Sequence, residues 1–196
     1  KLDSGYHLKD FKIAYKCFGR LNKNKDNAIL ICHALTGDQY VTGTNPITKK
    51  NGWWSRMVGE NKSIDTNKFF VICTNVLGGC IGSTGPKEIN PDTKEPFGYT
   101  FPSITIKDIV KVQKYLIDAL DIASIFAIVG ASMGAMQVLQ WTIDYPEKIN
   151  NVIHIAGALK HSAQNIAFHE VGRQAIMNDS SWKNGKYKDG ETKPER

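Results

Sequence analysis

The alternation of apolar and polar residues divides the chain into short strand-like runs separated by turns and helices. Residues 11–18 alternate between apolar and polar positions, as a half-exposed strand does. Residues 28–32, 69–73 and 124–129 are instead continuously apolar and bounded by polar turn residues, which is typical of parallel strands covered on both faces. Residues 149–155 are a further candidate strand. The pattern therefore predicts a sheet with buried, parallel central strands.

Residues 104–120 are the clearest predicted helix. Thr105 is a suitable N-cap residue, and Asp108 follows three positions later as its capping-box partner. Beyond this cap, apolar residues recur at helical spacing and predict a buried stripe: Ile109, Val112, Leu116 and Leu120. The succession of strand, loop, strand, helix, strand, helix and strand is that of a doubly wound α/β sheet.

The pattern changes near Leu159, where polar residues and histidines begin to interleave. We expect at most the start of this segment to be helical. We expect the polar tail from Trp182 to Arg196 to be mobile. The chain therefore divides into residues 1–157, which form the core, and residues 158–196, which begin a helical insert.

The composition narrows the class of protein. A length of 196 residues suits one domain, and the four cysteines include no Cys-x-x-Cys pair. We therefore expect a reduced, cytoplasmic protein that binds no metal through these thiols. The net charge of +6 comes mostly from scattered lysines, and no apolar stretch approaches a membrane span. From the scattered charge and the lack of a long apolar stretch, we expect that the protein binds neither nucleic acid nor a membrane. The N-terminus does not resemble a signal peptide, and the missing initial methionine suggests a fragment or a processed form.

The strongest chemical signal is Gly130-Ala131-Ser132-Met133-Gly134. It follows a predicted buried strand and precedes residues at helical spacing: Met136, Leu139 and Ile143. The two glycines allow a turn too sharp for bulky neighbours, and this turn lifts Ser132 clear of the sheet at a helix N-terminus. The arrangement is the nucleophile elbow of α/β-hydrolase-like folds, so Ser132 is the predicted nucleophile.

A serine nucleophile needs donors that stabilise the oxyanion of its tetrahedral intermediate. The elbow supplies one, the backbone N–H of Met133. The second should follow an earlier strand, and the loop after residues 28–32 makes the N–H of Leu35 the best candidate.

No residue is a convincing base for Ser132. His33 precedes the serine, whereas this fold places the acid and then the histidine after it. The later histidines and aspartates are poorly placed and are better read as structural: His154, His161, His169, Asp144, Asp179 and Asp189. The sequence thus contains a nucleophile and an oxyanion hole without an identified base.

Seven blocks of residues carry a resemblance to a known family. They comprise residues 33–38, residues 52–59 in part, residues 75–80, residues 82–86, residues 130–134, residues 140–146 in part, and residues 170–176. With these blocks the chain resembles homoserine O-acetyltransferases, the α/β-hydrolase-fold acyltransferases of methionine biosynthesis, along nearly its whole length. It departs mildly from them at Ala131 and Ala135, where members often have glycine.

The resemblance implies a ping-pong reaction without a bound cofactor. Ser132 would accept an acetyl group from acetyl-CoA and pass it to the hydroxyl of L-homoserine, with Leu35 and Met133 holding the oxyanion. Arg173 matches the family arginine that meets the amino-acid substrate, and its alternative is a salt bridge with Glu170. Members are expected to be homodimers.

Members of the family also continue past Arg196, where the helical lid and the sheet are completed and the triad aspartate and histidine follow. The resemblance therefore implies that this chain is the N-terminal portion of the enzyme, truncated inside the lid, and that it is inactive alone.

Three alternatives stay open. A homoserine or serine O-succinyltransferase would use another acyl donor, and a serine esterase of the same fold would use water as the acceptor. In a different class, the chain is a non-catalytic fragment or an interaction module.

Overall fold

The computed structural model describes residues 1–185 and residue 194. Most of the tail that was expected to be mobile therefore lies outside the described residues. No helix within the described part is both long and apolar enough to cross a membrane.

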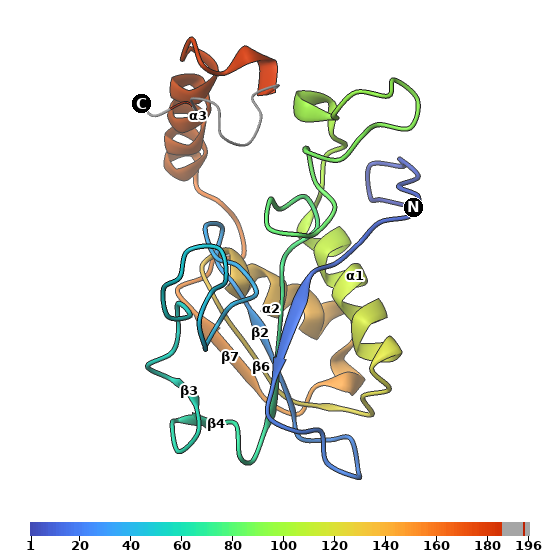
Figure 1. The fold of residues 1–196 in the computed structure, drawn as a ribbon, viewed down its shortest axis with the longest axis vertical. Coiled ribbons are helices and arrows are strands. Elements are labelled where there is room, and N and C mark those ends of the chain that lie inside the picture. The colour runs from blue at the N-terminus through green and yellow to red at the C-terminus, as the bar shows by residue number, and fades with distance from the viewer. Residues whose placement is uncertain (186–193, 195–196) are drawn as a thin grey trace.

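A five-stranded sheet forms the centre of the molecule (Figure 1). Across it the strands run in the order β1 (Tyr15–Phe18), β5 (Phe70–Thr74), β2 (Ala28–Cys32), β6 (Ile125–Ala131) and β7 (Val152–Ile155). Only β1 is antiparallel to its neighbour, and the other pairs are parallel. The predicted α/β architecture with a mostly parallel sheet is thus confirmed.

A small separate sheet pairs two further strands, β3 (Val58–Gly59) and β4 (Ile64–Asp65). The helices are α1 (Ile106–Ala119), α2 (Met133–Asp144) and α3 (Ala163–Met177). Short 3-10 turns add η1 (Gly98–Thr100), η2 (Pro146–Lys148) and η3 (Lys183–Gly185).

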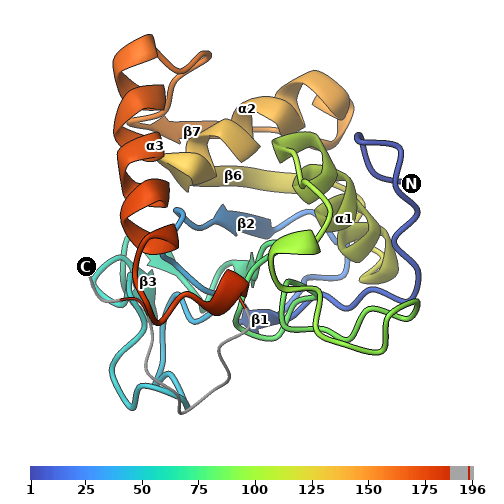
Figure 2. The same cartoon turned by 90° about the horizontal axis from the view of Figure 1, so that it is seen from above.

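The two faces of the sheet are covered by different parts of the chain. Leu30 on β2 faces the cluster that α1 and α2 cover, and Trp141 of α2 is fully buried there. The two helices lie side by side over this face (Figure 2). Ile31 faces the opposite cluster, which the segment containing Val41 and Val58 covers. Because β2 alternates between these two layers, its continuously apolar sequence is what the fold requires.

Helix α1 begins as predicted. Thr105 is its N-cap, and the Thr105 and Asp108 side chains each bond to the other's backbone N–H in a complete capping box. Ile109 and Val112 of the predicted stripe are buried.

Several details differ from the sequence-based expectation. The first strand begins at Tyr15, because Lys12 and Ala14 donate their N–H groups to the side chains of Thr84 and Ser83 instead of pairing in the sheet. Helix α3 is 15 residues long, which is more regular than the expected segment that starts helically at best.

Helix α2 buries a face other than the one marked by Met136, Leu139 and Ile143. Its buried residues are Gly134, Ala135, Gln137, Val138 and Trp141, and Ile143 is 65% exposed. The elbow sets this rotation, because Gly134 must pack against the end of β2. The division at residue 157 stays a prediction, and it falls in the loop between β7 and α3.

Candidate active site at the carboxyl edge of the sheet

Ser132 lies in the turn that joins β6 directly to α2. Its backbone has φ 55° and ψ −120°, a conformation that non-glycine residues rarely adopt and that marks strained functional turns. Its N–H donates to the carbonyl of Ile155 on β7 at 3.1 Å. The predicted sharp turn is therefore present, and Ser132 is exposed at its apex.

The two elbow glycines are required by close backbone contacts. A Cβ on Gly130 would lie 2.3 Å from the carbonyl oxygen of Gly134, and a Cβ on Gly134 would lie 2.1 Å from that of Cys32. Both distances are far below van der Waals contact. The elbow thus presses the start of α2 against the carboxyl end of β2.

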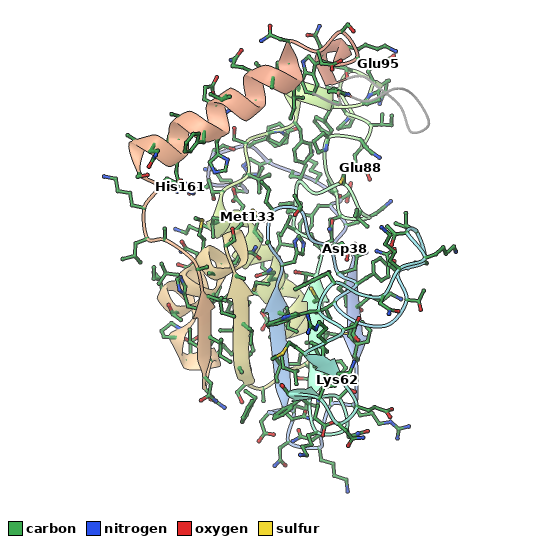
Figure 3. All side chains as sticks on the ribbon, turned by 90° about the vertical axis from the view of Figure 1, so that its left-hand side faces the viewer. Asp38, Lys62, Glu88, Glu95, Met133 and His161 are labelled. Carbon is green, nitrogen blue, oxygen red and sulfur yellow. The ribbon has the colours of Figure 1, made fainter. Side chains whose placement is uncertain are left out.

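The loop after β2 meets the elbow at the same edge of the sheet. Strands β2 and β6 are parallel neighbours, with Cys32 opposite Gly130. Leu35 follows in this loop and is 68% exposed. Figure 3 shows Met133 at the end of the strands, between the sheet and α3. Leu35 and Met133 therefore leave adjacent strands at the same edge, which is the arrangement that an oxyanion hole needs.

His33 is engaged beneath this loop. Its side chain is 1% exposed, and its Nε2 accepts the N–H of Val76 at 3.3 Å. The ring proton therefore sits on Nδ1, which donates to the carbonyl oxygen of Ala34 at 2.7 Å. Burial lowers the pKa of His33, partly offset by the Ala34 carbonyl and the charge of Asp38. Neither ring nitrogen is free to take a proton from Ser132.

The sequence-based analysis missed a buried polar chain behind the elbow. Gln137 of α2 is fully buried, and its Nε2 donates to the carbonyl oxygens of His33 at 3.2 Å and Met133 at 3.4 Å. Gln113 of α1 donates to the Gln137 side-chain oxygen at 2.8 Å. One signal was available in the sequence. Gln137 stands directly before Val138 in the helix that follows the elbow, and both residues are buried.

Arg173 belongs to α3, and this helix lies beyond the carboxyl ends of the strands (Figure 1). Its guanidinium donates through Nε to Glu170 at 2.9 Å, so the salt bridge weighed as the alternative does form. It also lines a cavity of about 220 Å³ with His161, Ile166 and His169. The rings of the two histidines meet edge to face there.

The described residues contain no cluster of three or more side chains suited to hold a metal ion. Burial raises the pKa of the Cys32 thiol to about 12 and that of Cys17 to about 11. These thiols are therefore protonated at neutral pH and are not nucleophiles.

The comparisons with known proteins agree with this fold. Residues 27–196 match a family described as having the alpha/beta hydrolase fold. A homoserine O-acetyltransferase of Rhodospirillum rubrum is 58% identical over 196 residues, which cover all of this chain and 50% of that protein. The chain thus spans about half the length of the curated relatives it matches.

Two solved structures show the same fold. A homoserine O-acetyltransferase from Bacillus anthracis matches with a TM-score of 0.84 and 34% identity, covering 93% of this chain and 50% of that one. An esterase matches with a TM-score of 0.85 and 35% identity, covering 96% of this chain and 53% of that one. The chain therefore belongs to the α/β-hydrolase fold family, and over its whole length it resembles the homoserine O-acetyltransferases of that family.

Proposed function

We propose that this chain carries the nucleophile and oxyanion hole of a cytoplasmic homoserine O-acetyltransferase. The observation that supports this most is the strained Ser132 elbow in a chain 58% identical throughout to one such enzyme. The elbow supports the chemistry of acyl transfer, and the sequence similarity supports acetyl-CoA as the donor and homoserine as the acceptor.

In the first half-reaction the Ser132 hydroxyl attacks the thioester carbonyl of acetyl-CoA. A bond forms between Oγ and the acyl carbon, the carbon–sulfur bond breaks, and the CoA thiolate leaves and takes up a proton. In the second, the hydroxyl of homoserine attacks the acyl-serine, the ester moves to homoserine, and Ser132 regains its proton. The N–H groups of Leu35 and Met133 stabilise both oxyanions.

Arg173 binds the carboxylate of homoserine in this proposal. A guanidinium matches a carboxylate as a planar, two-pronged donor. In the structure Arg173 already holds Glu170, so binding requires that it share or exchange this partner. The cavity beside it, lined by His161 and His169, lies on the same helix and its preceding loop.

The base that takes the Ser132 proton and the aspartate that orients it belong, in this proposal, to a part of the enzyme outside the 196 residues. A chain without them should have negligible transferase activity by itself, since a serine without its base is a poor nucleophile. In the same proposal, the full-length enzyme is a homodimer that uses acetyl-CoA and homoserine and holds no cofactor.

The test is homoserine-dependent release of CoA by the full-length enzyme. Replacing Ser132 by alanine should lower kcat by at least about 1,000-fold. The reference variant is Ser162→Ala, which changes the N-cap serine of α3 and should leave most of the activity. Equal CoA release without homoserine would refute the transferase assignment. Release by the 196-residue chain that disappears in Ser132→Ala would refute its inactivity.

A serine esterase is the second candidate, because an esterase structure matches this chain as well as a transferase structure does. Turnover of acetyl esters with water, unchanged by homoserine, would favour it.

A further inference from the structure

The carbonyl group of Ala34 controls where the Leu35 N–H points. In a trans peptide the C=O and the following N–H point in opposite directions. The Ala34 oxygen accepts from His33 Nδ1 at 2.7 Å and from the Gly37 N–H at 2.9 Å. Since both donors hold this oxygen on one side, the Leu35 N–H is directed to the other.

The preceding peptide is held by Gln137. Its side-chain Nε2 donates to the carbonyl oxygen of His33 at 3.2 Å, across 104 positions of sequence. The same nitrogen donates to the carbonyl oxygen of Met133 at 3.4 Å. One amide group therefore ties the loop that carries Leu35 to the first turn of the helix that carries Met133.

Gln137 is itself held in place from behind. The Gln113 amide donates to Gln137 Oε1 at 2.8 Å and to Thr74 Oγ1 at 3.1 Å. The Gln113 oxygen accepts from the Trp141 indole at 2.8 Å. Gln113, Gln137 and Trp141 are each at most 2% exposed. Because every amide atom of the two glutamines has a partner, the Gln137 side chain has one favoured orientation.

We propose that Gln137 is a positioning residue that fixes the Leu35 N–H relative to the Met133 N–H, and so sets the geometry of the oxyanion hole. An oxyanion hole works only when both donors are preorganised at hydrogen-bond distance from the developing charge. The contact of Gly134 with the Cys32 backbone holds the end of β2. The buried Gln137 amide holds the carbonyl of the next residue, His33, which leads into the loop. The inference rests on the proposed acyl-serine function.

The experiment compares Gln137→Met, which keeps the length of the side chain and removes its hydrogen bonds, with Gln113→Met in the full-length enzyme. Gln113→Met removes the bond to the Gln137 oxygen and keeps the Gln137 nitrogen that donates to His33. Each variant is assayed for the rate of acylation by p-nitrophenyl acetate, for kcat and KM, and for thermal stability. A boronic acid inhibitor, whose adduct with Ser132 places a negatively charged oxygen in the hole, reports the geometry directly.

Gln137→Met should lower the acylation rate and kcat by about 10- to 100-fold, less than the roughly 100- to 1,000-fold cost of deleting a donor. KM should stay within a factor of about three, and the boronate Ki should rise in parallel with the loss of kcat. Gln113→Met should lose at least as much thermal stability as Gln137→Met, but its kcat should fall by less than about threefold.

Two results would overturn the proposal: an unchanged boronate Ki in Gln137→Met, or an equal loss of kcat in both variants at equal loss of stability. If Gln137→Met does not fold, Gln137→Glu serves the same purpose, because it keeps the acceptor for Gln113 and removes the donor to His33. A Ser132→Ala enzyme measured alongside separates the positioning role from the proposed function. If Ser132→Ala still becomes acylated, the proposed function is refuted. If Ser132→Ala is not acylated and the Gln137 variant behaves like the wild type, only the positioning role is refuted.

Discussion

Gly134 shows how narrow the steric tolerance of the elbow is. A Cβ at this position would lie 2.1 Å from the carbonyl oxygen of Cys32, and that backbone cannot move without disturbing β2. Gly134→Ala should therefore destabilise the full-length protein by about 2–3 kcal/mol and misplace Ser132, which reduces acylation. Gly172→Ala is the matched control, because nothing lies within 4 Å of its Cβ on α3. Urea unfolding measures the stability of both variants. Equal stability would contradict the role of the contact between Gly134 and Cys32.

His33 makes stability depend on pH. Burial lowers its pKa in the folded protein, so the unfolded chain binds this proton more readily. The stabilisation is complete above the unfolded pKa of about 6.5 and is lost as the pH falls below it towards the folded pKa. The free energy of unfolding should therefore rise between pH 5 and 7 more steeply in the wild type than in His33→Asn, whose amide retains a donor. Parallel pH profiles would show that His33 does not contribute.

The stability of helix α1 depends on the side chain that caps its N-terminus. The Thr105 hydroxyl accepts the Asp108 N–H at 3.2 Å, and the Asp108 carboxylate returns a bond to the Thr105 N–H at 3.0 Å. Thr105→Ala should lower the free energy of unfolding by about 1 kcal/mol, whereas Thr105→Ser keeps the hydroxyl and should lose much less. Denaturant midpoints of the two variants test this, and identical midpoints would show that the cap adds nothing.

Strand β7 is the outermost strand of the described sheet, and three of its apolar residues are exposed: Val152, Ile153 and Ile155. An exposed apolar edge strand is a template for pairing with another chain. The 196-residue chain should therefore self-associate when expressed alone, and Ile153→Lys should reduce this. Ile143→Lys is the control, because Ile143 is equally apolar but lies on α2. Light scattering against concentration measures the effect, and equal scattering from both variants would contradict it.

The local elements were predictable because their signals are local. The apolar run of β2 and the Thr105 cap appear in the sequence as they do in the fold, since period and capping chemistry involve neighbouring residues only. The first strand was predicted too long, because Lys12 and Ala14 bond to Thr84 and Ser83 about 70 positions away. The buried face of α2 was not foreseen, because contact with Cys32 sets its rotation.

The sequence alone determined the order of the strands in the main sheet and of α1 and α2 between them, the Gly-x-Ser-x-Gly turn and the resemblance to an acyltransferase family, because each depends on residues close together along the chain. The sequence predicted the β2 loop beside the elbow, but only the tertiary structure assigned a role to His33. It also joined Gln113, Gln137 and the His33 carbonyl into one buried chain. Such hydrogen bonds join residues that are adjacent only after the parallel strands align, so no local pattern encodes them.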